Sequence, residues 1–192
     1  MPKIKELRDE ELVEYVRSKD QEQYREVVAR YQEKLLRYAE RIVNDRDAAQ
    51  DTVQQAFIKA FANLKGFDVS RKFSSWIYRI VHNEAINLLK RGSKEVTVNP
   101  ELWQMVSDDS DEGFEKALED KERDKLLNDC LKEIPVIYRA PVSLFFFDSK
   151  SYEEISDILR MPMGTVGTRM KRGKKLLKQV YLAKARQNPF GG

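Results

Sequence analysis

Residues Ser151–Lys178, SYEEISDILRMPMGTVGTRMKRGKKLLK, predict two helices joined by a tight turn. The first helix begins with a capping box, in which Ser151 caps the helix and Glu154 reaches back to it. The turn is Arg160–Gly164, where Pro162 suits the first position of the next helix because an N–H there has no intrahelical partner. This layout predicts a helix-turn-helix unit, whose second helix fits the major groove of DNA.

The second helix of this unit has two faces of opposite character. One face carries apolar or small residues at helical spacing: Val166, Met170, Gly173, Leu177 and Val180. The opposite face is polar and basic: Thr165, Thr168, Arg169, Lys171, Arg172, Lys174, Lys175 and Lys178. A helical hairpin with a solvated basic face has the same pattern, but the combination favours DNA binding.

Composition narrows the class of protein. The chain has 192 residues, of which 41% are hydrophobic and 35% charged, as expected of a globular protein. We expect no membrane insertion, no signal peptide and a cytoplasmic location, because no apolar run approaches the roughly 18–20 residues of a membrane span. The single histidine, His82, and the single cysteine, Cys130, are expected to be structural. No phosphate loop or Ser-His-acid set is present, so we expect no enzyme, no catalytic residue, no cofactor and no metal.

Charge is unevenly distributed, although the net charge is only +3. Residues 99–124 contain ten acidic and three basic side chains, whereas residues 160–192 contain nine basic and no acidic ones. This segregation predicts a nucleic-acid-binding C-terminal end and a different task for the acidic stretch.

Apolar residues at spacings of three and four predict four helices in the N-terminal half. They occupy about residues 9–18, 21–43, 47–64 and 70–91. Asp47 and Ser70 are the expected caps of the last two. The third helix is expected to turn these residues inward: Val53, Phe57, Ala60, Phe61 and Leu64. Its outer face is polar, and simple solvation would explain the residues there: Asp51, Gln54, Gln55 and Lys59.

A second stripe on the fourth helix combines an aromatic ring, two amides and two cations: Trp76, Arg79, Asn83, Asn87 and Lys90. This mixture suits single-stranded nucleic acid, because bases stack on rings and cations hold phosphates. The preceding loop Gly66–Lys72 adds an aromatic residue and two bases. Trp76 fits a core position equally well, whereas Asn83 favours a function.

The C-terminal half follows residues 94–113, which have no helical period. A helix is expected at 114–133, and another begins near Ile134–Pro135. Pro141 lies inside that second, apolar segment and would kink the helix or delay its start. The side chains of Phe145–Phe147 cannot all point to one side of a helix, so at least one meets a partner or lies at the helix end.

Five motifs occur in order along the chain: DTVQQAF (51–57), FSSWIYRIVHN (73–83), IPVIYR (134–139), SYEEI (151–155) and PMGTVGTR (162–169). Together they resemble the motifs of bacterial RNA polymerase sigma factors, specifically the extracytoplasmic-function (ECF, group IV) type. The resemblance covers about residues 9–91 and 114–180. It implies a sigma factor that binds core RNA polymerase, directs it to specific promoters and opens the −10 region.

The resemblance also implies an all-α fold of two small helical domains joined by an acidic flexible linker, the C-terminal one a helix-turn-helix. Residues 1–92 would be the region 2 domain for polymerase binding and −10 recognition and melting. Residues 93–113 would be the linker, threading polymerase channels. Residues 114–192 would be the region 4 domain for −35 recognition.

Three contact surfaces are implied, residue by residue. The clamp helices of the largest polymerase subunit would meet Asp51, Gln54, Gln55 and Phe57. Single-stranded −10 DNA, with one base flipped into a pocket, would meet Phe67, Ser70, Arg71, Lys72, Phe73, Trp76, Arg79, Asn83, Asn87 and Lys90. Duplex −35 DNA would meet Ser151, Thr165, Thr168, Arg169, Lys171, Arg172 and Lys175. The polymerase flap, promoter DNA and an anti-sigma factor complete the implied partners.

Some residues depart from the family pattern. Gln55 replaces a usual glutamate, Gly167 a common basic residue and Gly173 a frequent alanine, while Pro141 and Phe145–Phe147 are unusual. We therefore hypothesise weaker or altered −35 reading and a dedicated protein partner. Two other classes fit less well: a helix-turn-helix regulator acting alone, and a protein-binding adaptor or decoy that no longer opens promoters.

Overall fold

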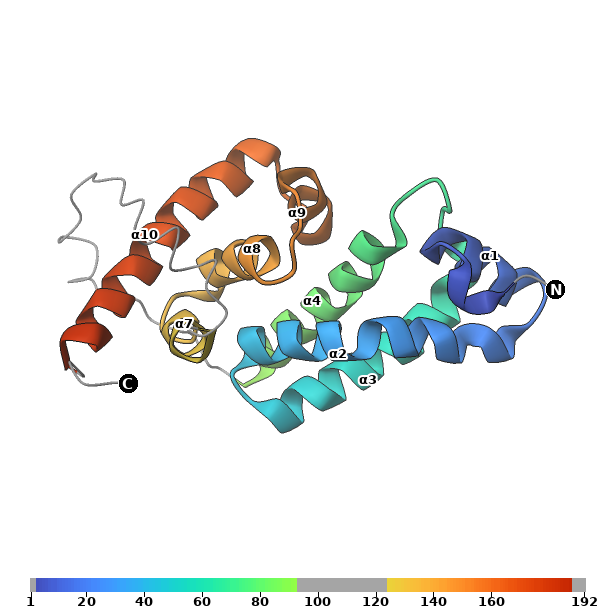
Figure 1. Ribbon diagram of the computed structural model, residues 1–192, viewed down its shortest axis with the longest axis horizontal. Coiled ribbons are helices and arrows are strands. Elements are labelled where there is room, and N and C mark those ends of the chain that lie inside the picture. Colours follow the sequence, from blue (N-terminus) through green and yellow to red (C-terminus); the bar gives the residue numbers. More distant parts are fainter. Residues whose placement is uncertain (1–2, 93–123, 188–192) are drawn as a thin grey trace. The chain divides into compact units, whose positions relative to one another are not determined.

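The computed structural model describes residues 3–92 and 124–187, which are helical and contain no strand (Figure 1). They form two compact units. The first contains α1 to α4, and the second contains α7, α8 and α10 with the beginning of α9. The predicted all-α fold of two helical domains is confirmed. The expected linker at 93–113 and the first part of the helix expected at 114–133 lie outside the described residues. No helix in the described ranges is long and apolar enough to cross a membrane.

The first unit is a bundle in which α2, α3 and α4 pack on one another (Figure 1). Its helices are α1 (Asp9–Ser18), α2 (Tyr24–Val43), α3 (Arg46–Asn63) and α4 (Phe73–Arg91). Short 3-10 turns are η1 (Ile4–Glu6), η2 (Gln21–Gln23) and η3 (Leu64–Gly66). The predicted periodicity holds on α2, where these residues are buried: Val27, Tyr31, Leu35, Tyr38 and Ile42.

Two helix starts differ from the sequence prediction. The N-cap of α3 is Asp45, whose Oδ1 accepts the Ala48 N–H at 2.9 Å, and not Asp47. α4 begins at Phe73, whose N–H donates to Glu10 Oε1 on α1 at 2.9 Å. Ser70 therefore does not cap α4. The cap of α3 is thus a neighbouring aspartate two positions earlier in sequence, whereas the first N–H of α4 is bonded by a residue from another helix.

The second unit contains the helix-turn-helix. It contains α7 (Asp124–Leu131), α8 (Val136–Phe146), α10 (Met163–Gln187) and the first part of α9 (Tyr152–Leu159). The capping box is confirmed, since the Ser151 N–H donates to Glu154 Oε2 at 3.1 Å and the Glu154 N–H donates to Ser151 Oγ at 3.2 Å. Pro162 lies one residue before α10, and its carbonyl accepts the Thr165 N–H at 2.9 Å.

Pro141 lies inside α8 and does not delay the start of the helix. A proline removes one N–H donor to the carbonyl four residues earlier, which is that of Ile137. Ile137 is 48% exposed, so water can reach this turn. α8 ends at Phe146 and Phe147 follows it, in agreement with the expectation that one phenylalanine lies at the helix end. Phe145 and Phe146 pack edge to face at 4.9 Å.

Gly173 lets α10 approach α8 closely. A Cβ atom at this position would lie 2.6 Å from Val142 Cγ2 and 3.1 Å from the Tyr138 carbonyl oxygen. The expected apolar stripe of α10 is buried on this side: Val166, Met170, Gly173, Leu177 and Val180. Behind it, the buried Arg139 guanidinium donates to the carbonyls of Ile134 and Lys132, each at 2.8 Å.

Candidate nucleic-acid and protein interfaces

The loop between η3 and α4 is held by a short-range hydrogen-bond pattern. Asp68 Oδ1 accepts the Ser70 N–H at 3.0 Å and the Ser70 hydroxyl at 2.7 Å. These bonds favour the carboxylate and lower the pKa of Asp68. Ser70 is thus engaged within the loop, while the side chains of Arg71 and Lys72 are exposed.

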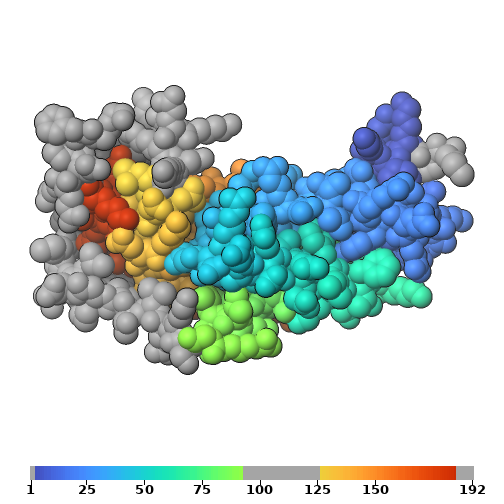
Figure 2. Space-filling view, turned by 90° about the horizontal axis from the view of Figure 1, so that it is seen from below, coloured from blue at the N-terminus to red at the C-terminus, as the bar shows by residue number. Residues whose placement is uncertain are grey.

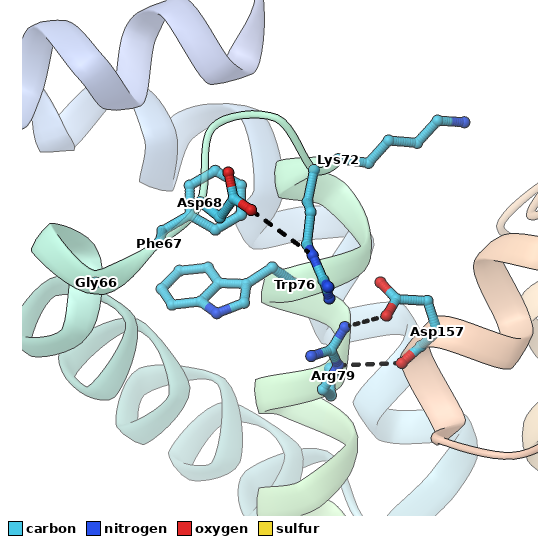
Figure 3. A pocket seen from close by; sticks show the side chains of 8 residues that line it. Gly66, Phe67, Asp68, Lys72, Trp76, Arg79 and Asp157 are labelled. Carbon is cyan, nitrogen blue, oxygen red and sulfur yellow. Dashed lines mark hydrogen bonds and ion pairs between the residues drawn. The ribbon is translucent and has the colours of Figure 1, made fainter.

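Three aromatic rings meet at the base of this loop, and Figure 3 shows two of them, Phe67 and Trp76. The Trp76 ring centroid lies 5.1 Å from that of Phe67 and 5.5 Å from that of Phe73. Phe67 is only 4% exposed and Phe73 is fully buried, whereas Trp76 is half-buried. Trp76 therefore combines the two roles considered for it: it packs on the core through two phenylalanines and keeps part of its ring accessible.

The predicted second stripe of α4 continues from Trp76 along the helix. Arg79 lies one turn beyond Trp76 on the same face (Figure 3), and Asn83, Asn87 and Lys90 are exposed. The neighbouring His82 points to the core, where the Tyr38 hydroxyl lies 2.9 Å from its Nδ1. Burial lowers the pKa of His82 to about 4, so at neutral pH its ring in this hydrogen bond is uncharged. His82 is structural, as expected.

The outer surface of α3 is open within the first unit, as Figure 2 shows in cyan and teal. Asp51, Gln54 and Gln55 are exposed there. Phe57 is buried, and its carbonyl accepts the Tyr24 hydroxyl at 2.8 Å.

The same face of α3 continues with two apolar residues that the sequence reading did not assign to it. Ile58 is 55% exposed and Phe61 is 42% exposed. The prediction that Phe61 points inward is wrong: its ring covers the edge of Tyr24, at 4.9 Å between centroids, and leaves one side in solvent. Ile58 follows Gln55 by three positions and Gln54 by four, and Phe61 follows Ile58 by three. This helical spacing was the available signal.

The basic face of α10 borders a groove shared with α8. The groove has a volume of about 360 Å³ and is lined by Ile137, Tyr138, Gly164, Thr165, Thr168, Arg169 and Arg172. Thr168, Lys171 and Arg172 are exposed, and Thr165, Arg169 and Lys175 are half-buried. Ser151 is exposed and occupied as the cap of α9. Ile137 was not among the predicted site residues, because nothing in its spacing links α8 to α10.

The exposed side of the first turns of α10 carries little side-chain bulk. A Cβ atom built at Gly164 or at Gly167 meets nothing within 4 Å. The Thr168 hydroxyl donates to the Gly164 carbonyl at 3.0 Å, so its methyl group is the part left for outside contacts. In the described ranges, no cluster of His, Cys, Asp and Glu could hold a metal ion.

Family models match both halves of the chain. Sigma-70 region 2 matches residues 27–95, and Sigma-70 region 4 matches residues 124–177. Among curated proteins, the ECF RNA polymerase sigma factor SigW of Bacillus subtilis is 30% identical over 174 residues, which cover 87% of this chain and 93% of SigW. RNA polymerase sigma-H factor of Pseudomonas aeruginosa is 32% identical, and the alignment covers 88% of this chain and 91% of that protein. ECF RNA polymerase sigma-E factor of Escherichia coli K12 is 31% identical, covering 90% and 93%.

Two solved structures share the fold at lower identity. CnrH, solved in complex with the cytosolic domain of CnrY, aligns with a TM-score of 0.67 and 21% identity over 91% of this chain and 97% of CnrH. The sigma factor RpoE from Bartonella quintana, solved with the anti-sigma factor NepR, aligns with a TM-score of 0.62 and 19% identity over 82% and 95%. At these identities the likeness supports the fold.

Proposed function

The chain belongs to the ECF sigma factors of bacterial RNA polymerase, and we propose from this membership how its surfaces direct the polymerase to promoters and open the −10 region. Sigma factors are initiation factors and not enzymes, in agreement with the sequence expectation. Within the proposal we assign the chain to group IV and to the cytoplasm. We also keep the domain limits 1–92, 93–113 and 114–192.

Polymerase binding is assigned to the outer face of α3. Asp51, Gln54 and Gln55 would contact the clamp helices of the largest subunit, and the exposed Ile58 and Phe61 extend this face with apolar area. Phe57 is buried, so we assign it the support of this face from beneath rather than direct contact. With the neutral Gln55, apolar burial carries a larger share of the binding free energy.

Strand opening is assigned to the loop 66–72 and the adjoining stripe of α4. Trp76 would stack on a base, Asn83 and Asn87 would bond base edges, and the cations would hold phosphates: Arg71, Lys72, Arg79 and Lys90. Phe67 and Phe73 are buried and would support Trp76 from below, and Ser70 would shape the loop through Asp68. The single observation that carries this assignment is the continuity of ring, amides and cations on one helical face next to the loop.

Reading of the −35 element is assigned to α10. Thr165, Thr168 and Arg169 line the groove beside α8, with Lys171, Arg172 and Lys175 along the same helix and Ser151 at the start of α9. Gly167 offers no side chain to the bases, so positioning through phosphates would outweigh base reading. The apolar surface of this unit is proposed to meet the polymerase flap. An anti-sigma factor is a further proposed partner, as found with RpoE of Bartonella quintana.

The test is run-off transcription with core polymerase, followed by mapping of the start sites. The proposal predicts transcripts from a defined set of promoters and co-purification with the core enzyme. Sequence-specific duplex binding without polymerase association would favour the solitary regulator. Polymerase binding without any transcript from genomic templates would favour the adaptor or decoy.

A further inference from the structure

Helix α1 contacts both ends of the loop that precedes α4. Arg17 Nη1 donates to the Phe67 carbonyl oxygen at 2.9 Å, and the Phe73 N–H donates to Glu10 Oε1 at 2.9 Å. Both bonds are partly buried. Glu10 and Arg17 are seven residues apart, which places them two turns apart on one face of α1. One face of one helix therefore holds Phe67, near the start of the loop, and Phe73, the first residue of α4.

Both bonds supply hydrogen-bond partners that the loop does not provide by itself. The first N–H groups of a helix have no intrahelical partner, and Lys72, at the N-cap of α4, forms no side-chain cap. The Glu10 carboxylate fills this role and brings a negative charge to the positive end of the helix dipole. The Arg17 bond is charge-assisted and is stronger than a bond between neutral groups.

α1 is itself fixed to α2, so it can act as a rigid support. Asp9 accepts from Arg30 Nη1 at 2.9 Å and from the Tyr31 hydroxyl. Arg30 also donates to the Leu7 carbonyl at 2.8 Å. On its inner side α1 buries three aliphatic residues, namely Leu12, Val13 and Val16. The loop is thus tied, through α1, to the longest helix of the first unit.

We propose that Glu10 and Arg17 are positioning residues for promoter opening, which hold the loop 66–72 and the first turn of α4 in the geometry that captures the melted strand. This inference rests on the proposed function of the loop. Fixing both loop ends before DNA arrives lowers the ordering cost of strand capture. Neither residue touches the outer face of α3, so polymerase binding does not depend on them.

The test uses the full chain with core polymerase on a promoter mapped with the wild-type protein. Glu10→Ala removes the bond to the Phe73 N–H, and Arg17→Ala removes the bond to the Phe67 carbonyl together with the ion pair between Arg17 and Glu14. Glu10→Gln keeps a carbonyl acceptor for the Phe73 N–H. Glu33→Ala and Arg37→Ala are matched controls, because these exposed residues of α2 pair only with each other in the described structure. The rate of amide hydrogen exchange in residues 66–76 of the free chain reports how firmly α1 holds the loop. Permanganate reactivity of the −10 strand reports promoter opening.

We expect Glu10→Ala and Arg17→Ala to accelerate exchange in 66–76 and to slow opening about threefold to tenfold, as for loss of one hydrogen bond. Polymerase affinity should stay within about twofold, and Glu10→Gln should open like the wild type. Faster exchange with opening at the control rate overturns the positioning role. An unchanged rate of amide exchange in residues 66–76 overturns the claim that α1 holds the loop. If the wild type fails to open any promoter, the proposed function falls and this inference with it.

Discussion

Two glycines on α10 make a paired test of how the second unit is packed. Gly173 faces α8, where an added Cβ would lie 2.6 Å from Val142 Cγ2, whereas Gly167 faces open space. Ordinary contact begins near 3.4 Å, so Gly173→Ala requires α8 or Val142 to move by roughly 0.8 Å in a close-packed site. The Tyr138 backbone oxygen, at 3.1 Å from the same point, limits that movement.

Both substitutions gain the same helix propensity, about 0.8–1.0 kcal/mol for Gly to Ala. Gly167→Ala should therefore stabilise the second unit by about that amount, since nothing opposes it. Gly173→Ala adds an overpacking penalty of about 1–3 kcal/mol. The difference between the two variants cancels the propensity gain and isolates the packing penalty, again about 1–3 kcal/mol.

The assay is urea unfolding of the full-length variants, followed by amide exchange of peptides from residues 136–187. Peptides from residues 9–92 in the same sample serve as the internal control and should not change. Val142→Ala combined with Gly173→Ala should recover part of the loss, because it removes the nearer of the two contacts. Equal stability of Gly167→Ala and Gly173→Ala would refute the described approach of α8 and α10.

Three other perturbations test separate parts of the structure. Burial lowers the pKa of His82 to about 4, below its unfolded value of about 6.5. Because the unfolded chain takes up the proton first, the stability of the fold decreases as the pH drops from about 6.5 to 4. Thermal unfolding measured against pH should show a smaller loss of stability for His82→Gln than for the wild type. Arg139→Met should destabilise the second unit by about 2–4 kcal/mol in urea unfolding, because the buried Ile134 carbonyl and the partly buried Lys132 carbonyl lose their guanidinium donor; no loss would contradict this role. Gly167→Arg adds a cation to an open helical face, so affinity for duplex promoter DNA should rise and the log–log salt slope steepen by about one; an unchanged slope would place that face away from DNA.

Features of the fold that depend on neighbouring residues in sequence were predicted well. The bounds Asp9–Ser18 of α1 and the Ser151–Glu154 capping box agree with the structure. Both follow from short-range rules, helical periodicity and reciprocal capping, which need no information about tertiary contacts. The buried stripe of α10 follows from the same periodicity.

Features that depend on distant partners were missed. The cap of α4 comes from Glu10, 63 positions earlier, and no spacing rule links the two. Phe67 and Phe73 were assigned to a DNA surface by the family resemblance, whereas in the structure both are buried in a cluster of three rings. Phe61 and Ile58 were missed on the outer face of α3. Periodicity shows which face of a helix is apolar, but it does not show how much of that apolar face the neighbouring helices cover.

The central claim is that the stripe beginning at Trp76 opens promoter DNA separately from polymerase binding. The most direct measurement compares Asn83→Ala with the wild type in two assays: permanganate reactivity of the −10 strand and affinity for core polymerase. Asn63→Ala is the matched control, an exposed asparagine at the end of α3 whose amide donates to the Lys59 carbonyl. We predict a loss of opening of about tenfold for Asn83→Ala, as for one specific base contact, with polymerase affinity unchanged. Equal loss in both assays, or opening at the level of Asn63→Ala, would contradict the account.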